Sequence, residues 1–65
     1  MKIDTNRIKI ILAERGLTRA ALAALCGISR QNISTILTRG TCEPKTAGKL
    51  AKGLNIPVAE IAKEG

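Results

Sequence analysis

The stretch from Thr18 to Leu37, TRAALAALCGISRQNISTIL, constrains the fold more than any other part of the sequence. Before Gly27, small and apolar residues recur at helical spacing, namely Leu22, Ala23, Leu25 and Cys26. A glycine at this point suits a chain reversal with positive φ, where a Cβ would clash. We therefore expect two short helices joined by a tight turn.

The second of these helices, over about residues 30–38, is expected to have one apolar and one polar side. Ser29 is placed to cap it, and its apolar side consists of Ile33, Ile36 and Leu37. Its polar positions are Arg30, Gln31, Asn32, Ser34 and Thr35. A short polar face rich in hydrogen-bonding groups, on a helix held across another helix, is typical of an element that enters the DNA major groove.

The remaining chain adds three expected helices, each bounded by residues that begin or end helices. Asp4, Thr5 and Asn6 are N-cap types before the first helix, and Gly16 ends it. Thr18 caps the helix over residues 19–25. Pro44 opens a fourth helix, with Asn55 at its C-terminal turn, and Pro57 opens a short fifth one. We predict one all-α domain over residues 1–65 with five helices.

The core of such a domain has to be built from Ile, Leu, Val and Ala, because the 65 residues include no aromatic side chain. Cys26 falls on an apolar helix face and is expected to be a small core residue. Gly48 and Gly53, inside the fourth helix, are expected only to weaken it slightly. We do not expect a disulfide between Cys26 and Cys42. Nor do we expect zinc, since two cysteines without histidine cannot complete a tetrahedral set.

The formal net charge of +6 favours a polyanionic partner, most often nucleic acid. No apolar run is long enough to cross a bilayer, and the N-terminal residues do not resemble a signal peptide, so we expect a cytoplasmic protein. Without histidine or another base near Ser29, Ser34 or the cysteines, we do not expect an enzyme or a cofactor. We also expect no small-molecule ligand, because 65 residues leave no room for a ligand-sensing domain.

The motif residues follow the pattern L-A-x-x-x-G-[IV]-S-x-x-x-[IV]-S-x-[IL], which begins at Leu22 and ends at Ile36. This pattern resembles that of the phage-repressor and Cro-like helix-turn-helix family, also called xenobiotic-response-element-like. The similarity extends over residues 14–18 and 44–61, and so over nearly the whole chain. It implies a five-helix domain that binds double-stranded DNA with its third helix in the major groove and regulates transcription, most often as a repressor.

The resemblance also implies two sets of residues that contact DNA. The base-reading residues would be Arg30, Gln31, Ser34 and Thr35. The phosphate-contacting residues would be Thr18, Arg19, Ser29, Asn32, Thr38, Arg39 and Lys45. The chemistry of the first set agrees with this role, because Arg pairs with guanine and Gln with adenine through two hydrogen bonds each. Thr35 can offer a methyl to thymine or a hydroxyl to a base edge. The second set lies at expected helix N-termini and in the loop after the third helix.

Three positions depart from the family pattern. Arg19 stands where the family usually has Gln, and it still suits a phosphate contact. Leu37 stands where a Glu is common, and we expect it to pack on Leu12. The glycine after the third helix is displaced by one residue, to Gly40.

We expect a homodimer, formed in solution or only on DNA, because one recognition helix reads few base pairs. Two such helices about 34 Å apart would read a palindrome. The candidate contact residues between the two copies are Ile3, Ile56, Val58 and Ile61. The alternative is a protein-binding module such as an antitoxin or anti-repressor, in which Arg30 and Gln31 would be dispensable. RNA binding is less favoured, because no aromatic side chain is present to stack on bases.

Overall fold

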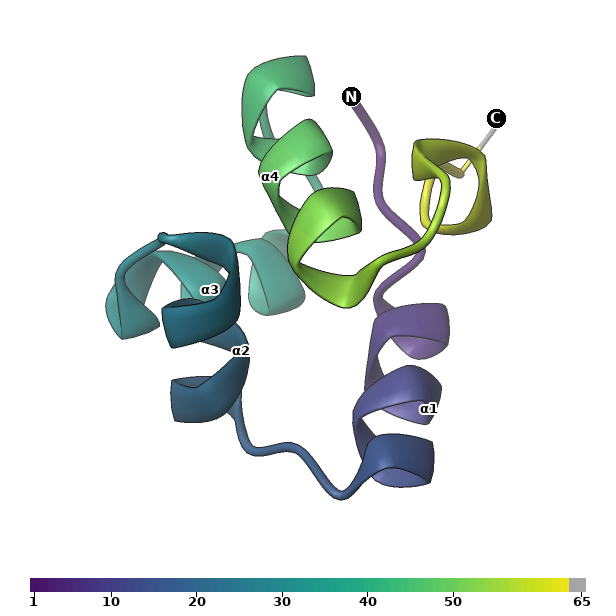
Figure 1. The fold of residues 1–65 in the computed structure, drawn as a ribbon. Helices are drawn as coiled ribbons and strands as arrows, with labels where there is room; N and C mark the ends of the chain where they lie inside the picture. The colour runs from purple at the N-terminus through teal and green to yellow at the C-terminus, as the bar shows by residue number, and fades with distance from the viewer. Residues whose placement is uncertain (64–65) are drawn as a thin grey trace.

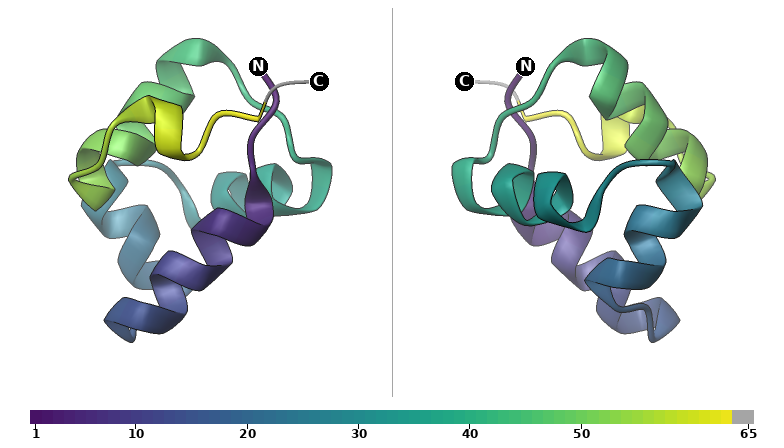
Figure 2. Two further views of the ribbon diagram at one scale, coloured as in Figure 1. Left: turned by 90° about the vertical axis from the view of Figure 1, so that its right-hand side faces the viewer. Right: turned by 90° about the vertical axis from the view of Figure 1, so that its left-hand side faces the viewer.

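The computed structural model describes residues 1–63, which form four α-helices and one short 3-10 turn (Figure 1). The elements are α1 (Thr5–Arg15), α2 (Arg19–Cys26), α3 (Arg30–Arg39), α4 (Pro44–Leu54) and the 3-10 turn η1 (Val58–Glu60). The all-α prediction is confirmed. Two isolated β-bridges, Lys2 with Thr41 and Ile3 with Ala62, place the N-terminal segment beside the chain after α3 and the chain after η1 (Figure 2). No helix within residues 1–63 has the length and hydropathy to span a membrane.

The predicted fifth α-helix is wrong, because only the single 3-10 turn η1 follows Pro57 in the described chain. The Ile61 N–H donates to the Val58 carbonyl at 3.0 Å and closes this turn. The Ile61 carbonyl then accepts a hydrogen bond from the Asp4 N–H at 2.8 Å. The Ala62 N–H adds one more helical bond, to the Val58 carbonyl at 2.9 Å, and the Lys63 N–H then donates to the Lys2 carbonyl at 3.0 Å. The chain after η1 therefore pairs with the N-terminal segment.

The turn between α2 and α3 has the predicted geometry. Gly27 adopts a φ of +66°, and the next N–H, that of Ile28, donates to the Ala23 carbonyl at 3.1 Å. The Ser29 hydroxyl accepts a hydrogen bond from the Asn32 N–H at 3.1 Å and begins α3. At the other end of α3, Gly40 has a φ of +73°, so the displaced glycine still ends this helix. Local residues thus fix both ends of α3.

The core is apolar throughout, and α1 to α4 all contribute to it. Its buried residues are Ile3, Ile8, Ile11, Leu12, Leu22, Ala23, Cys26, Ile28, Ile33, Ile36, Leu37, Ala47, Leu50, Ala51, Leu54 and Ile61. Leu12 and Leu37 both belong to this cluster, and Cys26 is a core residue as expected. Leu17, Ile56 and Val58 are partly buried against the core.

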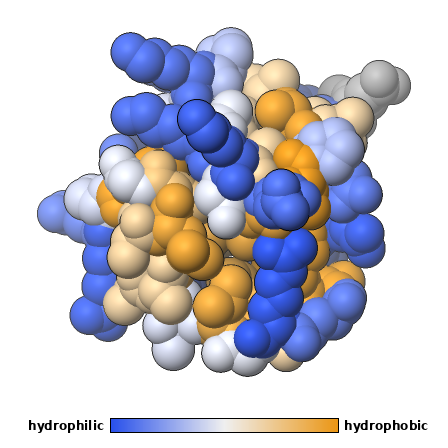
Figure 3. All heavy atoms as spheres, viewed as in Figure 1, coloured by the Kyte–Doolittle hydropathy of each residue, from blue (hydrophilic) through white to orange (hydrophobic). Residues whose placement is uncertain are grey.

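Two of the four candidate dimer contacts prove to be core residues. Ile3 is 2% exposed and Ile61 is fully buried, because the N-terminal segment and the chain after η1 lie side by side and turn both side chains inward. They cannot contact a second copy. Leu25 differs from the sequence prediction in the other direction. It belongs to the apolar repeat of α2 and was expected to face the core, but its side chain is 54% exposed. On the face seen in Figure 3, small and apolar side chains over α2 are bordered by hydrophilic ones.

α4 approaches α2 closely at Gly53. A Cβ at this position would lie 2.5 Å from Cys26 Sγ and 3.0 Å from the Leu25 carbonyl oxygen. The Cys26 thiol in turn donates to the Leu50 carbonyl at 3.7 Å. Gly53 is therefore required by the packing of two helices, whereas the sequence predicted only a slightly weakened helix.

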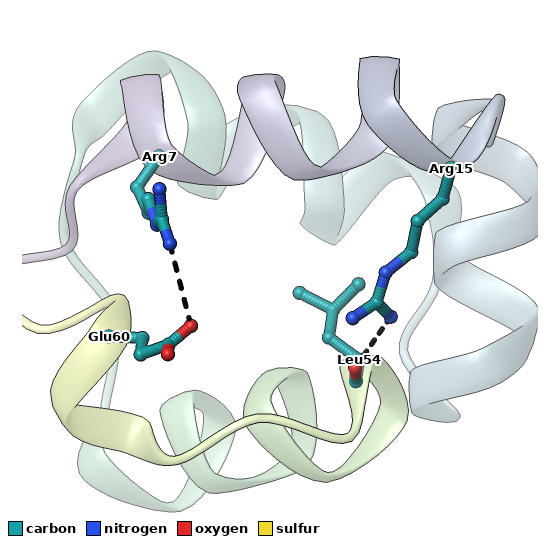
Figure 4. A network of polar contacts seen from close by, with 4 residues as sticks. All are labelled: Arg7, Arg15, Leu54 and Glu60. Carbon is teal, nitrogen blue, oxygen red and sulfur yellow. Dashed lines mark hydrogen bonds and ion pairs between the residues drawn. The ribbon is translucent and has the colours of Figure 1, made fainter.

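Two arginines of α1 connect it to the C-terminal part of the fold (Figure 4). The Arg15 guanidinium donates to the Leu54 carbonyl at the end of α4, at 2.6 Å in a partly buried position. The Arg7 guanidinium lies 3.8 Å from the Glu60 carboxylate, and both side chains are nearly half exposed. These contacts join α1 to the end of α4 and to η1.

Candidate nucleic-acid interface

The polar side of α3 faces outward along the whole helix. Burial of Ile33, Ile36 and Leu37 against the core fixes which side this is. The exposed residues of α3 are Arg30, Gln31, Asn32, Thr35, Thr38 and Arg39, and Ser34 is half-buried. The helix therefore presents donors, acceptors and two guanidinium groups on one continuous surface.

A shallow hollow of about 320 Å³ runs along this surface. Its lining consists of Gln31, Ser34, Thr35, Thr38 and Arg39. It brings together three of the four predicted base readers and two predicted phosphate contacts. Arg30, the first residue of α3, lies outside this hollow.

A larger hollow of about 740 Å³ lies between α3 and the start of α4. From α3 it is lined by Asn32, Thr35, Ile36 and Arg39. Across from them, Thr41 and Thr46 add hydroxyl groups that the sequence analysis did not single out. In the sequence, these two residues stand out only by their positions on either side of Pro44. Which side chains of this loop face α3 depends on where α3 ends, and the sequence does not fix that end exactly.

Two predicted phosphate contacts are hydroxyls that already cap helices. The Thr18 hydroxyl accepts from the Ala21 N–H at 3.1 Å, and the Ser29 hydroxyl accepts from the Asn32 N–H at 3.1 Å. Each oxygen thus serves as an acceptor, and each hydroxyl proton remains able to donate to a phosphate oxygen. The N-termini of α2 and α3 also offer free backbone N–H groups to an anion.

The remaining two predicted phosphate contacts, Arg19 and Lys45, line neither hollow. Arg19 is exposed at the first position of α2, next to the Thr18 cap. Lys45 is exposed in the first turn of α4, where Glu43 occupies the N-cap position without a side-chain cap bond. The Glu43 carboxylate disfavours an anion at this helix end, and Lys45 offsets its charge.

The segment that carries α2 and α3 is basic, although Glu43 also lines the larger hollow. Residues 15–42 include four arginines and no acidic residue. Arg15 is bonded to the Leu54 carbonyl, whereas the Arg19, Arg30 and Arg39 side chains form no hydrogen bond or ion pair within residues 1–63. Three guanidinium groups on or beside α2 and α3 are thus available to a polyanion.

The Cys26 thiol lies in the core, whereas Cys42 lines the larger hollow beside α3. Burial raises the pKa of the buried Cys26 thiol, and burial is also the main cause that raises the pKa of Cys42. Both cysteines are free. In the part of the chain that the structure describes, no three His, Cys, Asp or Glu side chains gather where they could hold a metal ion.

Residues 8–61 match a family model described as helix-turn-helix. The match begins in α1, includes α2, α3 and α4, and ends just after η1. No match was found among curated proteins or among solved structures.

Proposed function

Because the chain belongs to the phage-repressor and Cro-like helix-turn-helix family of DNA-binding proteins, we propose that it is a sequence-specific repressor of transcription. In this proposal it acts in the cytoplasm by occupying a palindromic operator. The observation that carries the proposal is the exposed polar side of α3, which lies in a region of the chain without acidic residues.

Base reading is assigned to the N-terminal half of α3. Arg30 and Gln31 occupy its first two positions, and recognition helices contact bases chiefly through their N-terminal residues. Arg30 suits guanine O6 and N7, and Gln31 suits adenine N6 and N7. Ser34 and Thr35, one turn later, reach the neighbouring base pairs.

Phosphate contacts surround this reading surface. Thr18 and Arg19 hold the backbone at the start of α2, and Ser29 and Asn32 hold it at the start of α3. On the opposite side, the contacts come from Thr38, Arg39 and Lys45. Since each neutralised phosphate releases counterions, binding should weaken steeply with salt.

We further propose that two copies bind one operator. The molecule measures 29 × 22 × 19 Å, and α3 has only ten residues. Two copies whose recognition helices lie about 34 Å apart therefore fit beside each other on one face of the duplex. With Ile3 and Ile61 buried, Ile56 and Val58 remain the candidate contacts between the copies.

The experiment that tests this function is selection of bound duplexes from a random pool with the full chain. We expect a palindrome whose half-sites are about one helical turn apart. The logarithm of the affinity should fall with log salt by about 0.9 per phosphate contact. In sedimentation, the saturated duplex should carry two copies, and a single copy on a two-half-site duplex would refute the dimer.

A pool without enrichment, with weak and salt-sensitive binding to every duplex, would refute the regulator. It would favour the alternative of a protein-binding module, for which the positive charge is only generic.

A further inference from the structure

The hydroxyl proton of Thr35 is already used within α3. Its Oγ1 donates a hydrogen bond to the carbonyl of Gln31, one turn earlier in the helix, at 3.0 Å. A threonine hydroxyl has a single proton to donate. In this arrangement Thr35 cannot donate to the acceptor atoms of a base, which in the major groove are guanine O6 and N7, adenine N7 and thymine O4.

The Thr35 side chain nevertheless borders both hollows beside α3. It is exposed, and it lies in the hollow along α3 as well as in the larger one between α3 and α4. With its proton engaged, it can offer a base only its methyl group and the remaining lone pair of its oxygen. These two groups recognise different bases, since the methyl suits thymine and the lone pair suits the amino groups of cytosine and adenine.

We propose that Thr35 recognises a thymine through apolar contact between its own methyl group and the C5 methyl of the base. This inference rests on the proposed function and specifies the base read at one position of the half-site. The internal hydrogen bond favours one side-chain rotamer before binding, and an apolar contact through the methyl does not use the proton of that hydrogen bond.

The test uses the duplex that the unaltered chain selects, with deoxyuridine replacing each thymidine of a half-site in turn. Thr35→Val keeps the shape and methyl but removes the hydroxyl, and Thr35→Ser keeps the hydroxyl but removes that methyl. At one thymine of the half-site, replacement by deoxyuridine should weaken binding about fourfold, both for the unaltered chain and for Thr35→Val. A fourfold loss corresponds to the burial of one methyl group. The same replacement should leave binding by Thr35→Ser unchanged.

Thr5→Ser is the control, because it removes a methyl from a threonine of α1, which carries none of the proposed DNA contacts. This variant should stay as sensitive to deoxyuridine as the unaltered chain. Thermal unfolding of all three variants verifies that α3 is intact.

The inference is overturned if Thr35→Val loses binding while Thr35→Ser keeps it, since the oxygen would then be the reading atom. It is also overturned if no thymine shows a sensitivity that depends on Thr35. In both cases a selected duplex still exists and the proposed function stands. If the unaltered chain selects no duplex, the proposed function fails, and this inference fails with it.

Discussion

Gly53 lies where α4 passes closest to the C-terminal end of α2. The nearest atoms to a Cβ there would be Cys26 Sγ at 2.5 Å and the Cys26 Cα and Leu25 carbonyl oxygen at 3.0 Å. We expect Gly53→Ala to destabilise the fold by about 1–3 kcal/mol, the usual cost of overpacking, even though alanine favours a helix. The free energy of unfolding in urea measures this effect.

Gly48 provides the matched control on the same helix. A Cβ at Gly48 would meet no atom within 4 Å. Gly48→Ala should therefore stabilise the protein by roughly 0.5–1 kcal/mol through helix propensity alone. Equal destabilisation by the two substitutions would contradict the close approach of α2 and α4.

The thiols make a pH-dependent contribution to stability. Burial raises the pKa of Cys26 and Cys42 in the folded chain, so the folded state favours the neutral thiols. Their contribution is present below the unfolded pKa and is lost as pH rises through the folded pKa. Unfolding in urea should therefore become easier as the pH rises above the ordinary thiol pKa of about 8.5.

A variant with both Cys26→Ala and Cys42→Ala should lose most of this pH dependence. If the double variant shows the same decline as the unaltered chain, the thiols are not its source.

Single residues also show how far sequence reasoning extends. The roles of Gly27 and Ser29 follow from rules about the adjacent chain, and both were predicted. The role of Gly53 depends on Cys26, 27 residues earlier, and no local pattern contains that contact. For the same reason the sequence did not reveal that Leu25, within an apolar repeat, is exposed.

Among the helices, α1 depends on one strong polar contact with α4. The Arg15 hydrogen bond to the Leu54 carbonyl is 2.6 Å long and partly buried, and it places a cation at the C-terminus of α4. Arg15→Ala should cost about 1.5 kcal/mol of unfolding free energy, the lower end for a hydrogen bond from a charged group.

Arg7 is the control on the same helix. Its distance of 3.8 Å from Glu60 and the exposure of both side chains, 45% and 44%, predict a cost below about 0.5 kcal/mol for Arg7→Ala. An equal loss from both variants would show that Arg15 contributes no more than its surface charge.

The boundaries of α1 to α4 could be predicted because caps and stop residues act locally, as Asp4 and Gly16 do at the two ends of α1. The expected fifth helix is only the 3-10 turn η1, and after it the Ile61 carbonyl pairs with the Asp4 N–H near the other end of the chain, which no local pattern predicts. The same long-range pairing buries Ile3 and Ile61, which removed two candidate dimer contacts.

In the molecule as a whole, the polar surface of α3 is the part of the candidate site that the sequence predicted best. Helical periodicity alone separates its exposed side from Ile33, Ile36 and Leu37. The hollow that adds Thr41 and Thr46 arises where three segments meet, and the spacing of residues within one helix cannot predict it. The DNA contacts assigned to these residues stay predictions until binding is measured.

The most direct measurement of whether α3 reads bases is the ratio of two dissociation constants, for a scrambled duplex and for the selected one. We expect a ratio of about 10³ or more for the unaltered chain. Lys49→Ala, which removes one exposed charge on α4, should keep this ratio. In the variant with both Arg30→Ala and Gln31→Ala, the ratio should fall at least about tenfold, because each two-bond base contact contributes about 1–3 kcal/mol. A folded double variant that keeps the full ratio would contradict base reading by α3.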